Sequence, residues 1–140
     1  MTHQRLDCEG ITNASSPYPS AVLAGRLVHV SGQVSFDDAG AVVAAGDVAG
    51  QTRQSLERLQ RVLTSVGGSL DDVVACTVYL TDAEFAEPFN TEWARWFRDR
   101  RPARATVVAQ LLDSRLLVEV QATAVLIPEA AVAEPGGTAP

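Results

Sequence analysis

The chain has 140 residues, of which 46% are hydrophobic and 20% are charged, and this size and composition predict one globular domain with a substantial core. Its net charge of -6 offers no positive field for a nucleic acid, and no stretch approaches the ~20 apolar residues of a membrane span, so we expect neither kind of partner. Residues 1–9 lack the pattern of a secretory signal, and Cys8 and Cys76 lack the spacing of a disulfide framework or a zinc site, which indicates a cytoplasmic protein with reduced thiols.

The first half of the chain predicts a β-hairpin followed by a helix. Two apolar runs, residues 21–23 and 26–34, flank the dipeptide Ala24-Gly25, which is typical of a tight connection between strands. Between residues 47 and 66, apolar side chains recur at helical spacing with arginine and glutamate between them. Gly67-Gly68 then ends the pattern, as a left-handed helix cap does.

The second half predicts a strand, a helix and two closing strands. Residues 73–80 are a β-branched run of strand length. We expect the second helix from residue 88 to residue 98, with one apolar face made of Phe89, Trp93, Trp96 and Phe97. The closing strands span residues 105–111 and 116–127.

The order of these elements indicates the fold class. The sequence β-β-α-β-α-β-β describes a single α+β domain over residues 1–127, with two helices on one face of a mixed sheet. From residue 128 onward the chain is almost entirely Ala, Glu, Pro and Gly, with little to bury. We therefore expect residues 128–140 to form a flexible tail.

Alternation predicts which side chains share a face of the sheet. One set packs under the helices and the other points away from them: Ala105, Val107, Val118 and Val120 in the first, and Arg104, Thr106, Glu119 and Gln121 in the second. The opening strand alternates in the same manner, with one side made of Leu27, His29, Ser31 and Gln33. Two helices cover only one side of such a sheet, so the semi-apolar side that remains indicates contact with another subunit.

Arg104 and Glu119 are the most informative residues of the chain. Each charge lies in an apolar, alternating segment, where an ionised side chain has a desolvation cost unless it has a partner or a task. An arginine fork suits a carboxylate, and a nearby glutamate suits a water or a proton. If the closing strands form a hairpin centred between Asp113 and Ser114, the two side chains share a face roughly 13 Å apart. This spacing indicates two ends of a site for a small organic acid.

Each candidate also has a structural interpretation. A charged residue at a strand edge is more often solvated or salt-bridged, and Glu119 has Arg115 as an alternative partner. Tyr18 lies between two prolines, where it either closes a loop or lines a site. Ser31 lacks the G-x-S-x-G elbow of a nucleophile, and His29 is more typical of a structural or interface histidine. The residues alone leave these alternatives open.

Seven short features follow one another along the chain. They are Tyr18, Ser31-Gly32-Gln33, the long helix ending at Gly67-Gly68, Thr77-Val78-Tyr79-Leu80 with Asp82, Phe89-Asn90, Pro102-Ala103-Arg104 and Val118-Glu119-Val120. With these features in this order, the chain resembles the RidA (YjgF) family of reactive intermediate deaminases over about residues 11–127. No single triplet is specific, and the resemblance rests on their common register.

This resemblance implies a chorismate mutase-like fold, a homotrimer with active sites between subunits, and chemistry without a metal or an organic cofactor. It also implies hydrolysis of reactive imines and enamines, such as 2-iminopropanoate and 2-iminobutanoate, to 2-oxo acids and ammonia. By position, Arg104 matches the arginine that binds the substrate carboxylate. Glu119 matches the carboxylate that orients the attacking water or relays a proton.

Further positions match residues that line the family's cleft. The expected substrate-binding residues are Tyr18, Ser31, Gly32, Asn90, Ala105 and Thr106. Of these, the resemblance places three on a wall donated by the neighbouring subunit, namely Tyr18, Gly32 and Asn90. Thr106 falls where the family usually has a cysteine that acts mainly through its backbone carbonyl. The chain departs from the family pattern at Pro19, Gln121 and Leu111-Leu112, and these departures bear on substrate range more than on fold.

Two classes of function follow from these residues. The first is a deaminase that acts on small 2-imino acids, and the presence of both Arg104 and Glu119 favours it. The second is a ligand-binding or regulatory trimer that keeps the cleft without the chemistry. A deaminase specialised for a larger enamine in a pathway would use the same residues as the first class, so the sequence leaves the size of the substrate open.

Overall fold

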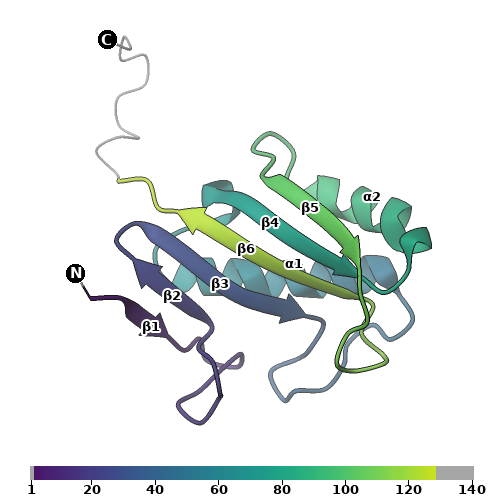
Figure 1. Ribbon diagram of the computed structural model, residues 1–140, viewed down its shortest axis with the longest axis horizontal. Coiled ribbons are helices and arrows are strands. Elements are labelled where there is room, and N and C mark those ends of the chain that lie inside the picture. Colours follow the sequence, from purple (N-terminus) through teal and green to yellow (C-terminus); the bar gives the residue numbers. More distant parts are fainter. Residues whose placement is uncertain (1, 129–140) are drawn as a thin grey trace.

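The computed structural model describes residues 2–128 (Figure 1). Its strands and helices follow the chain as β1 (Gln4–Leu6), β2 (Ala21–Ala24), β3 (Leu27–Val34), α1 (Val48–Ser65), β4 (Val73–Leu80), α2 (Ala86–Trp96), β5 (Ala103–Val108) and β6 (Val118–Val125). The predicted elements are confirmed. The short β1 is additional, because three residues carry too little alternation to be recognised in a sequence. The predicted tail lies outside the described residues, apart from Pro128.

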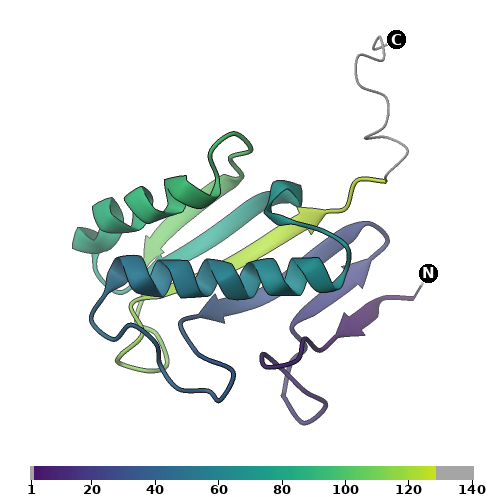
Figure 2. The same ribbon diagram turned by 180° about the vertical axis from the view of Figure 1, so that it is seen from behind.

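The six strands form one mixed sheet in the order β1-β2-β3-β6-β4-β5. Neighbouring strands are antiparallel except β4 and β5, which are parallel. Both helices lie on the same face of the sheet, which Figure 1 shows from the open side and Figure 2 from the helix side. As predicted, the helices leave the other face of the sheet uncovered, and we refer to it below as the open face.

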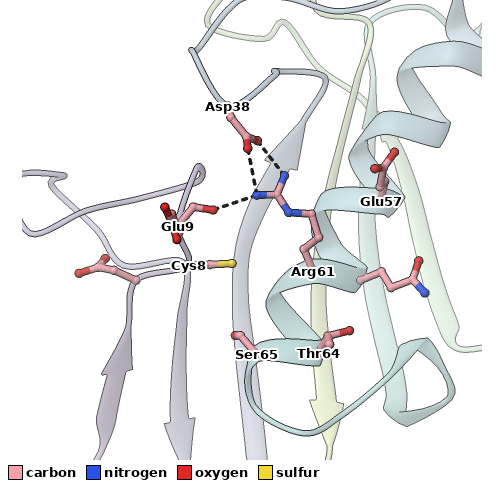
Figure 3. Close-up of a pocket in the computed structure, with 9 residues that line it drawn as sticks. Cys8, Glu9, Asp38, Glu57, Arg61, Thr64 and Ser65 are labelled. Atoms are coloured by element: carbon pink, nitrogen blue, oxygen red, sulfur yellow. Dashed lines mark hydrogen bonds and ion pairs between the residues drawn. The ribbon is translucent and has the colours of Figure 1, made fainter.

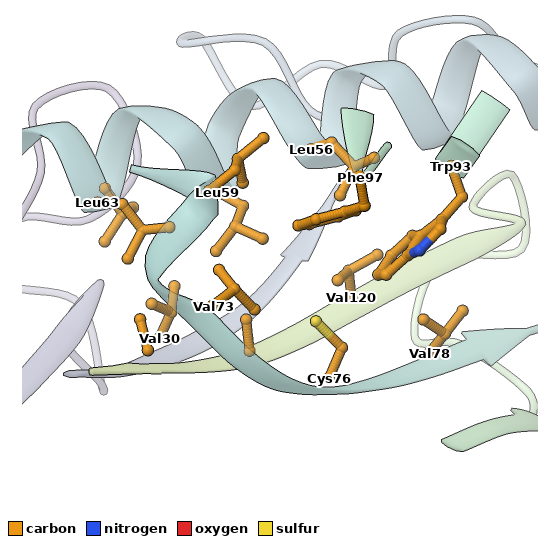
Figure 4. Packing of buried hydrophobic residues seen from close by; sticks show 14 of the residues in the cluster. Val30, Leu56, Leu59, Leu63, Val73, Cys76, Val78, Trp93, Phe97 and Val120 are labelled. Carbon is orange, nitrogen blue, oxygen red and sulfur yellow. The ribbon is translucent and has the colours of Figure 1, made fainter. Parts of the chain in front are cut away.

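Helix α1 begins and ends at signals that its sequence supplies. The Asp47 carboxylate accepts a hydrogen bond from Gly50 N at 3.0 Å, which caps the first turn. At the other end Gly67 takes a φ of 80°, and Gly68 N donates to Leu63 O at 2.8 Å. The apolar stripe of the helix packs on the sheet (Figure 4), with Leu56, Leu59, Val62 and Leu63 fully buried.

Helix α2 begins two residues earlier than predicted. A 3-10 turn at Ala83–Phe85, capped by Asp82 through a hydrogen bond from Glu84 N, continues directly into the helix. Pro88 therefore lies within the first turn, where its missing N–H leaves no helical hydrogen bond unmade. Of the predicted apolar face, Phe89, Trp93 and Phe97 are buried against the sheet, and Trp96 is partly buried.

The predicted hairpin between the two closing strands is wrong. Strand β6 lies between β3 and β4, whereas β5 pairs with the far side of β4 at the edge of the sheet. The segment between β5 and β6 is consequently a crossover past the end of β4, held by hydrogen bonds from Ala109 N to Leu80 O and from Thr81 N to Leu117 O. The order β4-α2-β5 is a strand-helix-strand unit, and such a connection makes its two strands parallel.

This topology reverses the predicted face of β5. Arg104 pairs with Cys76 and therefore lies on the helix side of the sheet, as does Thr106. Ala105 and Val107 lie on the open face instead, so the prediction that they pack under the helices is wrong. The prediction for β6 is confirmed, because alternate residues from Val118 onward are buried under the helices.

A bulge in β3 overturns one further assignment. The register between β3 and β6 shifts between Val30 and Gln33, so three residue steps on β3 oppose two on β6. Val30 and Gln33 therefore both face the helices, and Gln33 is buried rather than lying on the side of His29. The bulge displaces Ser31 and Gly32 toward the open face.

Candidate active site

A cleft of about 490 Å³ lies on the open face around the bulge. It is lined by Tyr18, Ser31, Gly32, Val34, Phe36, Leu112, Asp113, Leu116 and Glu119. Strand β3 and the segment after it supply one wall, and the crossover and β6 supply the other. The structure therefore brings four of the predicted site residues together, namely Tyr18, Ser31, Gly32 and Glu119.

The carboxylate of Glu119 lies directly against Gly32. A Cβ atom at position 32 would overlap Glu119 Oε2 and would lie 2.9 Å from its Cδ, so a larger residue at this position would displace the carboxylate. Within residues 2–128 no hydrogen-bond donor is assigned to the Glu119 carboxylate, and desolvation raises its pKa above the ordinary value. A carboxylate in this state is suited to hold a water or to exchange a proton.

Buried polar side chains hold the bulge in place from the helix side. The carbonyl of Ser31 accepts a hydrogen bond from Gln33 Nε2 at 3.0 Å, and Gln33 Oε1 accepts from Arg58 Nε at 3.4 Å. Arg58 is 5% exposed and also donates to the carbonyl of Phe36 at 3.0 Å, so two segments that line the cleft are attached to one buried guanidinium. Arg58 and Gln33 are therefore positioning residues. They were not predicted, because the alternation of polar and apolar residues does not reveal the bulge that turns Gln33 toward the helices.

Ser31 joins the bulge to the loop that carries Tyr18. Its hydroxyl donates to the carbonyl of Pro19 at 2.7 Å, and its backbone N–H donates to the carbonyl of Ser20 at 2.9 Å. The Ser31 hydroxyl is therefore occupied as a donor and retains only its capacity to accept. Tyr18 itself is 57% exposed at the margin of the cleft.

Arg104 belongs to a second cluster, at the β5 edge. Its guanidinium lies over the rings of Phe89 and Trp93, with its Cζ 5.2 Å and 5.0 Å from the ring centroids, and Nη2 donates to Asn90 Oδ1 at 2.7 Å. Desolvation by these neighbours lowers the pKa of Arg104, yet a guanidinium stays protonated in proteins. The same edge has a hollow of about 600 Å³ that extends over Phe97 and Pro102.

Helix α2 thus supplies a platform for the arginine. Phe89, Asn90 and Trp93 lie three and four residues apart, which places them on one helical face. In the sequence this spacing indicates an apolar face that packs in the core, and Asn90 alone of the three is predicted to line the site. Asn90 lies with Arg104 in the same chain, so the expectation that it shares a wall with Tyr18 and Gly32 is wrong within one chain.

Within one chain Arg104 and Glu119 do not meet. Their partners on β4 are Cys76 and Tyr79, three residues apart, and β4 lies between their strands. The Cα atoms of Arg104 and Glu119 are offset by three residues along the strands and by two strand spacings across the sheet, which corresponds to roughly 14 Å. The side chains also point to opposite faces, so the predicted shared face is wrong. The candidate site consists of two halves: the Glu119 half on the open face and the Arg104 half at the β5 edge.

Cys76 lies next to Arg104 on the helix side of the sheet. Burial raises the pKa of its thiol to about 12, and the nearby positive charge of Arg104 offsets only part of this effect. As predicted, the thiol packs as a small apolar group within the core.

A larger hollow, of about 800 Å³, lies elsewhere, between α1 and the segment after β1 (Figure 3). Its one arginine, Arg61, pairs with Asp38 at 2.8 Å and donates to the carbonyl of Glu9 at 2.8 Å. The remaining ionisable groups are mostly acidic, so this hollow offers no receptor for an organic acid. Within residues 2–128 no group of three His, Cys, Asp or Glu is placed to hold a metal ion, and no helix is long and apolar enough to cross a membrane.

Comparison with known proteins identifies the family of the chain. The family model described as Endoribonuclease L-PSP matches residues 10–126. The chain is 36% identical over 116 residues to the 3-aminoacrylate deaminase RutC of Acinetobacter baylyi, covering 83% of this chain and 92% of that protein.

Solved structures agree with the family model. A protein of the conserved Rid family from Yersinia pestis has a TM-score of 0.82 at 28% identity, over 89% of this chain and 100% of that one. A member of the YjgF family from Neisseria meningitidis has a TM-score of 0.76 at 29% identity, over 91% and 98% of the two chains. The chain therefore belongs to the Endoribonuclease L-PSP family, which is the RidA (YjgF) family that its motifs resemble.

Proposed function

We propose that the protein is a deaminase that hydrolyses reactive 2-imino acids and their enamine tautomers, such as 2-iminopropanoate and 2-iminobutanoate, to 2-oxo acids and ammonia, without a cofactor. The observation that carries this proposal is a glycine bulge that makes room for a desolvated glutamate, in a chain that also holds an arginine on an aromatic platform. The 36% identity to a 3-aminoacrylate deaminase supports the same class of reaction.

Arg104 is the proposed receptor for the substrate carboxylate. A guanidinium has five N–H donors, of which Asn90 occupies one and the two rings occupy none. The donors that remain include a fork that binds a carboxylate through two parallel hydrogen bonds. Contact with Phe89 and Trp93 fixes the plane of the guanidinium before substrate binds, which reduces the entropy lost on binding.

Glu119 is the proposed acid-base group. Water attacks the imine carbon and passes one of its protons to Glu119, while the imine nitrogen takes up a proton from solvent. A C–O bond forms and the C=N bond becomes a single bond, which gives a carbinolamine. Glu119 then gives its proton to the nitrogen as the C–N bond breaks and ammonia leaves, and the carbinol hydroxyl releases its proton to solvent as it becomes the carbonyl of the 2-oxo acid. Desolvation favours this role, because it raises the pKa of Glu119 toward the range in which a carboxylate both accepts and returns protons.

Since the two halves are separate within a chain, we propose that they meet between chains in a homotrimer of chorismate mutase-like arrangement. The open face supports an intersubunit contact. On strands β3, β6, β4 and β5 its residues include valines, threonines and Tyr79, and Glu119 is the one carboxylate among them. A face depleted of charge in this way is typical of a subunit interface. The exposed Arg104 at the β5 edge would then enter the Glu119 half of the neighbouring subunit.

A direct assay tests the deaminase proposal. An amino acid oxidase generates 2-iminopropanoate in situ, and a trapping reagent follows the imine that survives. We expect the wild-type protein to accelerate loss of the imine, and Arg104→Ala to abolish the acceleration. Arg98→Ala is the matched control, because it removes an exposed arginine outside both halves. If neither wild type nor control accelerates loss of any 2-imino acid generated in this way, the deaminase proposal fails and the binding or regulatory function is favoured.

A further inference from the structure

The cleft around Glu119 has a polar end and an apolar end. Glu119 pairs with Val34, and the Gly32 bulge, Ser31 and Tyr18 lie on one side of that pair. On the other side, β3 ends at Val34 and the chain turns, with Phe36 N donating to Val34 O at 2.8 Å. This turn places Phe36 in the lining of the cleft, and the crossover brings Leu112 and Leu116 to it as well. The apolar end therefore lies in the same cleft as the proposed acid-base group.

Leu112 is held in a fully exposed position beside this end of the cleft. The carboxylate of Asp113 accepts three hydrogen bonds from Arg115, from its backbone N at 2.9 Å, Nε at 3.1 Å and Nη2 at 2.7 Å. Buried Gln51 attaches the following residues to α1, donating to Arg115 O at 2.9 Å and accepting from Leu117 N at 2.7 Å. The crossover is thus a fixed turn, and it presents an exposed leucine.

The charges at the cleft exclude a second charged group on the ligand. Asp113 already has Arg115 as its partner, which holds the pKa of its carboxyl at about 2, and no cation lines the cleft. A ligand side chain with a carboxylate would meet Glu119 and Asp113 without compensation. A cationic side chain would lose water to Phe36, Leu112 and Leu116, and pairing with Glu119 would occupy the proposed acid-base group. An apolar side chain incurs neither of these costs at the apolar end of the cleft.

The size of the cleft points the same way. About 490 Å³ falls in the range of pockets that hold ligands much larger than 2-iminopropanoate, whose methyl group would leave the apolar end empty. Resting on the deaminase function proposed above, we propose that the preferred substrates are 2-imino acids with a branched aliphatic or aromatic side chain, and that Leu112 is a specificity-determining residue that covers this side chain.

The test compares imines generated in situ from leucine, alanine and aspartate. We expect kcat/KM for the leucine-derived imine to exceed that for the alanine-derived imine by about tenfold to a hundredfold, and the aspartate-derived imine to be a poor substrate. Leu112→Ser should lower the leucine-to-alanine ratio of kcat/KM about threefold to tenfold, because it removes apolar surface that the methyl group of the alanine-derived imine does not reach. Ile127→Ser, which alters an exposed apolar residue outside the cleft and outside the strands of the open face, should leave this ratio unchanged.

Each other outcome overturns the inference in a recognisable way. Equal kcat/KM values for the leucine-derived and alanine-derived imines would refute the apolar preference and leave the deaminase function standing. A preference that survives Leu112→Ser, or a variant that loses both activities or its oligomeric state, would remove the role of Leu112. Failure to hydrolyse any of the three imines would overturn the inference together with the deaminase function.

Discussion

Gly32→Ala tests whether the bulge in β3 exists to accommodate Glu119. The new Cβ atom would overlap Glu119 Oε2 and would lie 2.9 Å from Cδ and 3.3 Å from Cγ, so the carboxylate has to move. The end of a glutamate side chain moves at little cost, and the backbone at Gly32 is not left-handed, so alanine causes no backbone strain. Any loss of packing is offset by the lower entropy of the unfolded chain, about 0.4–1 kcal/mol for such a change. We expect the melting temperature to stay nearly constant.

The catalytic effect of the same substitution should be large. A positioned acid-base group contributes about 10²–10⁴-fold, and a displacement of about 1 Å is enough to lose about 10²-fold. We therefore expect kcat/KM of Gly32→Ala for 2-iminopropanoate to fall about 100-fold, equivalent to about 2.7 kcal/mol of transition-state stabilisation. The imine-trapping assay measures this loss, and thermal unfolding followed by circular dichroism measures the stability.

A double-mutant cycle identifies the cause of the loss. Glu119→Ala removes the carboxylate that the new Cβ atom would strike. If Gly32 acts through Glu119, adding Gly32→Ala to the Glu119→Ala protein should cause little further loss. Full activity in the single variant Gly32→Ala, or an undiminished loss in the Glu119→Ala background, would refute the reasoning.

Three other predictions concern single side chains. Desolvation raises the folded-state pKa of Glu119 above its ordinary value of 4.5, so the ionised carboxylate destabilises the fold. This destabilisation is absent below pH 4.5 and complete above the raised pKa. Glu119→Gln should therefore increase the free energy of unfolding, measured with urea, at pH 8 but not at pH 4. Trp93→Leu removes one ring from under Arg104 and should raise KM about twofold to fivefold with less change in kcat, whereas Trp93→Phe keeps a ring and should raise it less. Cys76, with a pKa of about 12, should resist iodoacetamide in the native protein at pH 8 and react after unfolding, as peptide mass spectrometry would show.

The sequence predicted the local elements well because their signals are local. Asp47, the apolar stripe of α1 and Gly67 set the bounds of that helix to within a residue or two. The strand predicted at residues 73–80 has the same first and last residues as β4. A β-branched run is a local signal for a strand, because its side chains pack against the core in one register.

Strand pairing could not be predicted in the same way, because it depends on contacts between distant segments. The order β4-α2-β5 contained the information that β5 is parallel to β4, yet the proximity of β5 and β6 in sequence favoured a hairpin. That one error placed Arg104 on the wrong face. The bulge at Ser31-Gly32 could not be predicted from alternation either. An extra residue in a strand moves every later side chain of that strand to the opposite face of the sheet. The choice of Arg104 and Glu119 did not depend on pairing, because a charge in an apolar strand is a local anomaly.

Complementation between two inactive variants tests whether each active site takes Arg104 from one chain and Glu119 from the next. Arg104→Ala and Glu119→Ala would be mixed in equal amounts, unfolded and refolded together. If chains assort at random in a trimer, half of the chains retain each residue, so about one quarter of the sites should recover both. Recovery of about one quarter of wild-type activity is the predicted result. No recovery above that of the separate variants, although light scattering shows mixed trimers, would contradict the account.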